Sequence, residues 1–140
     1  MSLPYHPPTG TIVICDFHGL VVPEMVKRRP SIVISPRLRK RDGLCTVVPL
    51  SKTEPNPIMP YHYRLHLSPA LPPPYDSTPS WVKGDMLYTV SLKRLSLPHK
   101  GKDPNGKRQY DIRTLDEADL IKIKECILHA LGMANLMSYS

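Results

Sequence analysis

The chain has 140 residues, of which 41% are hydrophobic and 22% charged, an ordinary composition for a globular protein. No apolar run approaches the roughly 18 residues of a membrane span, and residues 1–10 lack the apolar core of a signal peptide, so we expect one cytoplasmic domain spanning residues 1–140. The net charge of +7 favours a polyanion or an acidic protein as partner, and charge alone does not separate the two.

The first half of the chain predicts three consecutive strands. Apolar runs with strand character occupy residues 11–17, 31–35 and 45–50. An N-terminal tail, 1–10, precedes the first run, and a loop of about a dozen residues, 18–29, separates it from the second. Pro30 ends this loop, and Ser51 closes the third run. The short connection between the second and third runs favours an antiparallel pair.

The second half alternates short strands with loops. Residues 62–67 (HYRLHL) alternate polar and apolar side chains, which predicts a half-buried strand. The Pro-rich segment 69–80 is typical of turns and cannot hold a strand. Residues 83–95 contain a further short strand. The polar and basic segment 98–113 is expected to be a long surface loop.

One convincing helix is predicted near the end of the chain, over 114–135. Thr114 and Glu117 fit a capping box, and Gly132 is a plausible stop signal. Apolar residues recur along one face at helical spacing: Leu120, Ile123, Ile127, Ala130 and Leu131. This order of elements predicts a mainly β fold, a small barrel-like antiparallel sheet with a C-terminal helix packed on it.

The most informative residues lie where the second predicted strand begins. Pro30 biases Arg29 toward extended geometry, and the planar donor fork of a guanidinium suits a phosphate. Arg29 starts one strand and Ser51 ends its expected antiparallel neighbour, so the two are adjacent. Taken singly, each is more often a solvated cation or an ordinary terminal serine. Together with a base they suffice to cleave RNA without metal, because the 2′-OH supplies the nucleophile.

Other charged residues are candidates for the same site. Six of them are candidates for contacts with RNA: Glu24, Lys27, Arg28, His62, Arg64 and Lys83. Asp85 follows Gly84 where a later strand begins and is a candidate base. Each also fits a plain structural interpretation, as a turn residue or part of a solvated face. Trp81 either stacks a base or fills the core, and we favour the core.

The residues for other chemistries are missing. The sequence has no P-loop, GxGxxG or GxSxG motif. Of the six histidines only His62 and His66 are close, and about 13 Å of extended strand separates them, so we expect no metal and no cofactor. Cys15, Cys45 and Cys126 form no CxxC pair and lie in apolar runs, which indicates free core thiols.

Four segments, GTIVICDF, EMVKRRPSIVIS, TVVPLS and KGDMLYTVSLKRL, followed by a helix, resemble the PemK/MazF family of toxins from type II toxin–antitoxin systems. The resemblance implies an SH3-like antiparallel barrel that forms a homodimer. It also implies a metal-independent endoribonuclease that cleaves single-stranded RNA, especially mRNA, at a short sequence and leaves a 2′,3′-cyclic phosphate and a 5′-OH. An acidic antitoxin would neutralise it.

The resemblance also implies roles for individual residues. Arg29 matches the family's catalytic arginine, and Ser51 matches a hydroxyl position, usually threonine, that stabilises the transition state. Asp85 matches an aspartate that serves as a base in some members. Glu24 falls on an acidic loop position. This sequence departs from the family pattern at Pro23, where some members have histidine, and at Lys83, where some have arginine. The proton-transfer partners are therefore left open.

Two alternatives also stay open. The chain could be a non-catalytic SH3-like module that binds RNA or an acidic peptide, or a DNA-gyrase poison like those in the wider family of SH3-like toxins. The long loops 69–80 and 98–113 exceed those of compact members, and they could reshape substrate choice or antitoxin docking.

Overall fold

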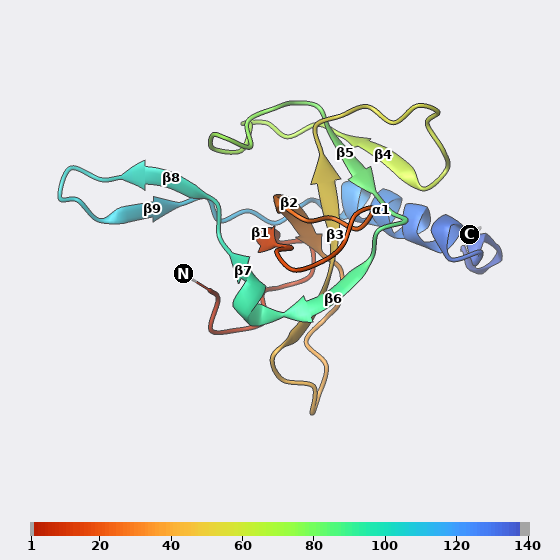
Figure 1. Ribbon diagram of the computed structural model, residues 1–140, viewed down its shortest axis with the longest axis horizontal. Helices are drawn as coiled ribbons and strands as arrows, with labels where there is room; N and C mark the ends of the chain where they lie inside the picture. Colours follow the sequence, from red (N-terminus) through yellow and green to blue (C-terminus); the bar gives the residue numbers. More distant parts are fainter. Residues whose placement is uncertain (1, 138–140) are drawn as a thin grey trace.

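The computed structural model describes residues 2–137 and shows a mainly antiparallel β fold with one α-helix near its C-terminal end (Figure 1). The strands are β1 Ile12–Asp16, β2 Arg28–Val33, β3 Leu44–Ser51, β4 His62–Leu65, β5 Ser80–Lys83, β6 Tyr88–Ser91, β7 Leu95–Ser96, β8 His99–Lys102 and β9 Arg108–Tyr110. The helices are α1, Glu117–Ala130, and two 3₁₀ turns, η1, Leu92–Arg94, and η2, Ala134–Leu136. Among these residues, no helix combines the length and apolar character needed to cross a bilayer.

Seven strands form one sheet in the order β4-β5-β3-β2-β1-β7, with β6 also paired to β3. All of these pairs are antiparallel. The expected mainly β class with a C-terminal helix is confirmed. The barrel is not closed, however, because within residues 2–137 the outer strands β4 and β7 each pair with one neighbour only.

The central strands are buried on both faces, as their almost uninterrupted apolar sequences predict. Successive side chains of β1 point to opposite sides, so Ile12 packs into one cluster and Val13 into another. The first cluster also holds Ile32, Val48, Leu50, Leu65, Val82, Ile123 and Ile127, and thus joins the sheet to α1. The second holds Cys15, Phe17, Val33, Cys45, Val47, Val90 and Leu95.

The second strand begins earlier than the sequence predicted. β2 starts at Arg28, and Pro30 lies inside it opposite Ile14 of β1. Pairing of β2 with β3 starts only at Ser31, so the missing N–H of Pro30 falls at a position where β2 has a neighbour on one side. The strand predicted over 31–35 therefore begins three residues earlier, at Arg28, and ends at Val33, because Pro30 continues the strand instead of ending the loop.

Three strands, β5, β8 and β9, were missed because they carry little hydrophobic periodicity. β5 has only four residues and follows the Pro-rich segment, yet its Trp81 and Val82 are both buried. The predicted surface loop 98–113 contains the hairpin β8–β9. This hairpin is polar on both faces, so its strands are held by backbone pairing that an apolar pattern does not reveal.

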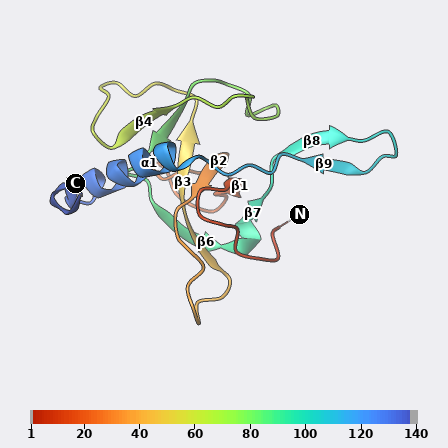
Figure 2. The same cartoon turned by 180° about the vertical axis from the view of Figure 1, so that it is seen from behind.

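The helix is shorter than predicted, and its N-cap is different. Asp116, not Thr114, caps α1, because its Oδ1 accepts a hydrogen bond from the Asp119 N–H at 2.8 Å. Ile123 and Ile127 face the core as expected, whereas Leu131 lies beyond the helix and is exposed. Figure 2 shows α1 crossing the back of the sheet beside β3 and β4.

Two contacts fix α1 against the strands. The hydroxyl of Tyr63 in β4 donates to Asp119 Oδ1 at 2.6 Å, and burial together with this bond raises the pKa of Tyr63 to about 12. Gly84, after β5, packs so tightly that a Cβ there would lie 2.9 Å from Cβ of Cys126 and 2.7 Å from the Tyr61 carbonyl. The helix therefore rests directly on the turn that leads to Asp85.

Candidate active site

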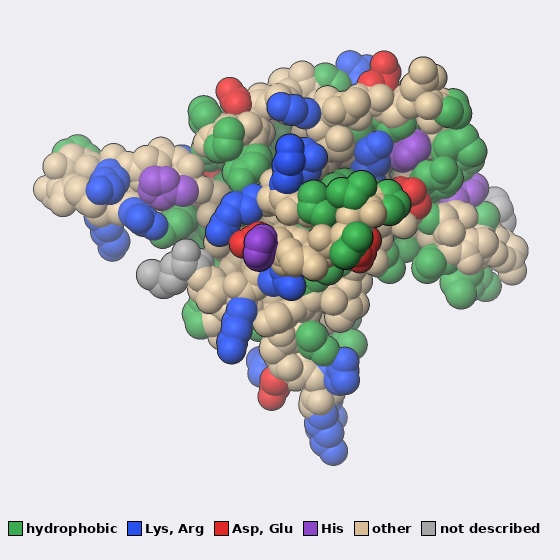
Figure 3. Space-filling model, in the orientation of Figure 1, with side chains coloured by type: hydrophobic (Ala, Val, Ile, Leu, Met, Phe, Trp, Pro, Cys, Tyr) green, Lys and Arg blue, Asp and Glu red, His purple; other side chains and the backbone are tan. Residues whose placement is uncertain are grey.

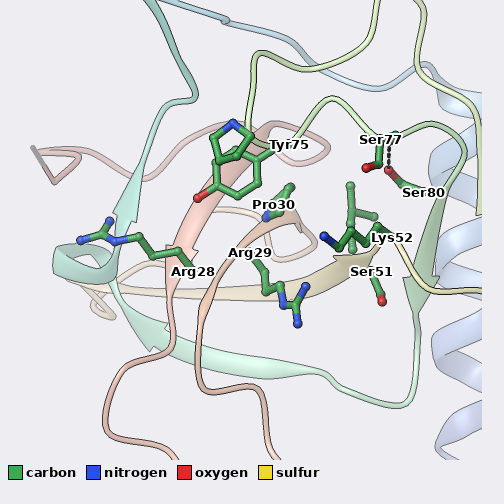
Figure 4. Close-up of a pocket in the computed structure, with 10 residues that line it drawn as sticks. Arg28, Arg29, Pro30, Ser51, Lys52, Tyr75, Ser77 and Ser80 are labelled. Atoms are coloured by element: carbon green, nitrogen blue, oxygen red, sulfur yellow. Dashed lines mark hydrogen bonds between the residues drawn. The ribbon is translucent and has the colours of Figure 1, made fainter.

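The register between β2 and β3 brings the two leading candidates together. Ser31 lies opposite Pro49, and continuing the antiparallel register by two residues sets Arg29 against Ser51. Both side chains line the same pocket of about 210 Å³ (Figure 4). That volume is below the roughly 300–1,000 Å³ of sites for drug-sized ligands, so it suits a group the size of a phosphate with part of its nucleotide.

The walls of the pocket come from two parts of the chain. The sheet contributes Arg28, Arg29, Pro30, Leu50, Ser51 and Lys52. The Pro-rich segment and the first residue of β5 contribute Pro74, Tyr75, Ser77 and Ser80. The pocket is therefore a cleft between the end of the β2–β3 pair and a loop folded over it. We call it the active-site pocket.

Arg29 carries a polar atom that the fold leaves unsatisfied. Its Nε is buried and has no hydrogen-bond partner among residues 2–137. Leaving a buried donor unpaired costs about 1–3 kcal/mol, so native proteins rarely do so without reason. In Figure 4 the guanidinium extends into the pocket toward the Ser51 side. A bound anion would supply the missing acceptor.

Ser51 is held at the point where β3 changes partner. It is 9% exposed, and it pairs with Trp81 of β5. Its Oγ accepts a hydrogen bond from the Thr53 N–H at 3.2 Å. Because this bond uses an acceptor lone pair, the hydroxyl hydrogen stays free to donate into the pocket.

Sequence reasoning missed Lys52 and the loop wall. Lys52 directly follows Ser51, where strict alternation would turn it away, but β3 ends at Ser51 and the chain bends. Its amino group points toward Arg29 in Figure 4, so two cations converge on one space. Tyr75 covers the opposite side of the pocket. The one signal for this wall was the length of the Pro-rich loop, since long ordered loops are often functional.

The loop cations and Glu24 are placed differently from one another. Arg28 lies on the pocket wall, where its guanidinium is 3.3 Å from Asp16 in a largely exposed ion pair. Glu24 accepts from the Val21 N–H at 2.8 Å and so stabilises its own loop. Neither Glu24 nor Lys27 lines the pocket, and both are exposed.

Three other candidates gather in a second region, the β4–β5 corner, made of His62, Lys83 and Asp85. His62 lies opposite Lys83, and Asp85 follows β5 by two residues. Burial lowers the pKa of His62, the Lys83 charge lowers it further, and Asp85 opposes both. His62 Nδ1 accepts from the Met59 N–H at 3.0 Å, which leaves Nε2 as the protonated nitrogen of the neutral ring.

The structure does not bring this corner into the active-site pocket. None of its three residues lines the pocket, and neither does Arg64, whose side chain is exposed. Trp81 is only 6% exposed, which agrees with its assignment to the core. Among the residues that the structure describes, the pocket walls consequently contain cations and hydroxyls but no carboxylate or imidazole.

The three cysteines lie in the interior as free thiols. Burial raises the pKa of Cys15 to about 12 and those of Cys45 and Cys126 to about 11. At neutral pH these three thiols are therefore protonated, and none of them supplies a thiolate nucleophile. Within residues 2–137 no group of three or more His, Cys, Asp or Glu side chains is arranged to hold a metal ion.

Comparison with known proteins identifies the family of the chain. Residues 9–131 match the PemK-like, MazF-like toxins of type II toxin–antitoxin systems. An uncharacterized protein of Haemophilus influenzae is 27% identical over 150 residues, covering 98% of this chain and 99% of that protein.

Two solved structures share the fold. MazF from Deinococcus radiodurans superposes with a TM-score of 0.64 at 19% identity, covering 92% of this chain and 99% of that one. An endoribonuclease from a mycobacterial species, solved in complex with its cognate antitoxin, gives a TM-score of 0.59 at 19% identity, covering 91% and 96%. The fold and the family match define a toxin of a type II toxin–antitoxin system. The chain belongs to the PemK-like, MazF-like family.

Proposed function

We propose that this toxin is a metal-independent endoribonuclease that cleaves single-stranded RNA at a short sequence. The observation that carries the proposal is the buried, unpartnered Nε of Arg29 in a pocket shared with Ser51 and Lys52. Two cations and a free hydroxyl hydrogen converge there, which is the donor set that a phosphate oxyanion requires. The solved mycobacterial relative named an endoribonuclease supports the same reading.

In the proposed reaction the 2′-oxygen attacks the adjacent phosphorus while the bond to the 5′-oxygen breaks. The 2′-OH loses its proton to a base and the 5′-oxygen gains one, giving a 2′,3′-cyclic phosphate and a 5′-OH. Arg29 and the Ser51 hydroxyl stabilise the charge that builds on the non-bridging oxygens. Lys52 adds a second positive charge to the pocket. Tyr75, on the far wall, offers a ring on which a base can stack.

Among residues 2–137, no carboxylate or imidazole lines the pocket, so the base has to reach the RNA from outside its walls. Asp85 remains our candidate from the sequence, although it stands outside the pocket walls. An RNA strand that runs from the pocket toward the β4–β5 corner would connect them. His62, Arg64 and Lys83 would then contact the RNA beside the cleaved bond.

We further propose that an acidic antitoxin binds this toxin and that the toxin assembles as a homodimer in the cytoplasm. Two solved relatives support an antitoxin partner, the mycobacterial endoribonuclease with its cognate antitoxin and the MazE–MazF pair from Deinococcus radiodurans. The net charge of +7 suits an acidic partner through charge complementarity.

The proposal is tested by incubating the purified protein with a pool of unstructured RNA in excess EDTA and mapping the new 5′-OH ends by sequencing. We expect cleavage at one short sequence. An oligonucleotide with that sequence and a single 2′-deoxy sugar before the scissile phosphate should bind and stay intact. Absence of cleavage in EDTA, or cleavage of the deoxy substrate at the same bond, would contradict the proposal.

A further inference from the structure

The β8–β9 hairpin, His99–Tyr110, forms an arm that projects from the body of the sheet (Figures 1 and 2). Four exposed cations lie on it: Lys100, Lys102, Lys107 and Arg108. Figure 3 shows Lys and Arg side chains gathered on this arm, apart from the rest of the molecule. None of them takes part in the ion pairs found within residues 2–137.

The arm's single carboxylate is already used by its own turn. Asp103 Oδ1 accepts hydrogen bonds from the backbone N–H groups of Asn105 and Lys107, both at 2.9 Å. Its Oδ2 accepts from Gln109 Nε2 at 3.3 Å. The tip is therefore fixed by Asp103, and the cations around it keep their charge available.

Two of the cations face each other across the hairpin. Lys102 lies directly opposite Arg108 in the β8–β9 register. Like charges in this arrangement destabilise a strand pair, so the cations do not serve the hairpin's own folding. A polyanion threaded along the arm would relieve the repulsion and release counterions.

The arm begins beside the active-site pocket. A hollow at its base is lined by Pro69–Pro73 on one side and by His99, Lys100 and Asp111 on the other. Pro73 lines this hollow and Pro74 lines the active-site pocket, so consecutive residues of one loop separate the two. A strand that leaves the pocket across this loop meets Lys100 next.

The base of the arm is tied to that loop. Arg113 forms a two-point ion pair with Asp111, at 2.6 and 3.2 Å, and donates to the Pro69 carbonyl. The rings of His99 and Tyr110 pack edge to face, with centroids 5.8 Å apart. These contacts hold the loop and the arm in one arrangement, so the cations stand at a set distance from the pocket.

We propose that the arm binds the phosphate backbone of the substrate RNA on one side of the cleavage site. The inference rests on the proposed RNA cleavage and adds a second contact region to it. Lysine-rich, wet and polar surfaces are typical of nucleic-acid contacts, whereas protein interfaces are depleted in Lys and centred on apolar anchors. Apart from Pro104, the residues at the tip of the arm are polar or glycine, and none is aromatic, which favours RNA over an acidic protein.

The test compares two sets of four charges. The arm variant is K100Q/K102Q/K107Q/R108Q. The matched control is R37Q/R39Q/K40Q/R41Q, which removes four exposed cations from the β2–β3 loop at the other end of β3 (Figure 1). Binding of an uncleavable 2′-deoxy-substituted RNA is measured across a salt series, with a long strand of about 20 nucleotides and a short strand of about six. Thermal melting checks that both variants fold.

We expect the arm variant to lose about tenfold or more in affinity for the long strand near 0.1 M salt, and its log–log salt slope to fall by about two to three. Its preference for the long over the short strand should disappear, while the control keeps it. An unchanged slope in the arm variant, or an equal loss in the control, would overturn the inference. So would a variant that loses affinity for an acidic antitoxin but not for RNA.

The two proposals fail separately in this design. If the wild type binds RNA with a steeper salt dependence than the arm variant but cleaves no RNA, the result would contradict the proposed function and support the role of the arm. If the wild type cleaves RNA but has the same salt dependence of binding as the arm variant, the result would support the proposed function and contradict the role of the arm.

Discussion

The active-site pocket and the β4–β5 corner both include residues of β5, yet they hold different parts of what the proposed RNA cleavage needs. The pocket contains Arg29, Lys52 and the Ser51 hydroxyl, which bind negative charge. The corner contains His62 and Asp85, side chains of the kinds that serve in acid–base catalysis. Burial and the Lys83 charge lower the pKa of His62, and Asp85 opposes them. Under the proposed function, the folded chain therefore already presents the groups that would bind a phosphate, whereas the groups that would transfer protons lie outside the pocket walls.

The largest expected effect on the cleavage rate comes from a substitution in the active-site pocket. Arg29→Ala removes the guanidinium from the pocket and should lower the rate of RNA cleavage by about 10²–10³-fold, the range for losing one preorganised donor to a transition-state oxyanion. The measurement is single-turnover cleavage of a defined oligonucleotide in EDTA. Arg28→Ala is the control, because Arg28 lies on the same wall but its charge is shared with Asp16.

If Arg28→Ala lowered the cleavage rate as much as Arg29→Ala, the total positive charge of the pocket would account for both losses. The buried Nε of Arg29, which has no partner among residues 2–137, would then have no special role in cleavage. Equal thermal stability of the two variants is needed to read the result.

The second prediction concerns the corner. Asp85→Asn should lower the cleavage rate by about 10²-fold, the lower end of the range for a general base, because Asp85 is exposed and reaches the RNA from outside the pocket walls. The measurement is the pH–rate profile of the variant against wild type. The acid limb of the profile should also disappear. A loss of tenfold or less, with the acid limb unchanged, would show that Asp85 is not the base.

The smallest effect is a change in proton affinity at His62. Its pKa should lie below 6.5, should rise in Lys83→Gln and should fall further in Asp85→Asn, since those charges act in opposite directions. The unfolded chain then binds the proton more tightly than the folded one. Stability from this group is therefore full above about pH 6.5 and declines as the pH falls. Proton NMR titration of the imidazole checks it, and a pKa above 6.5 in the wild type would be inconsistent with this account.

The pairing of Arg29 with Ser51 could be predicted from sequence because it depends on local rules. Two apolar runs joined by a short connection define an antiparallel pair, and antiparallel pairing sets the ends of the two strands together. The wrong start predicted for β2 did not affect this pairing, because Arg29 lies opposite Ser51 in the register of the two strands whether β2 begins at residue 28 or at residue 31.

The rest of the site could not be predicted, because it depends on long-range placement. The Pro-rich segment carries no periodicity, so nothing in its sequence said that Tyr75 would cover the pocket. The side of the β5–β6 turn on which Asp85 lies is set by the tight contact of Gly84 with α1, which joins residues far apart in the chain. The arm was missed for a related reason, as polar strands give no hydrophobic pattern.

The most direct measurement of the central claim is a pair of double-mutant cycles on the cleavage rate. If Arg29 and Ser51 stabilise the same phosphate, the double variant Arg29→Ala/Ser51→Ala should lose clearly less than the product of the two single losses. Arg29→Ala with Asp85→Asn should lose close to the product, because the pocket and the corner are separate regions. Multiplicative losses for Arg29 and Ser51 would contradict the account.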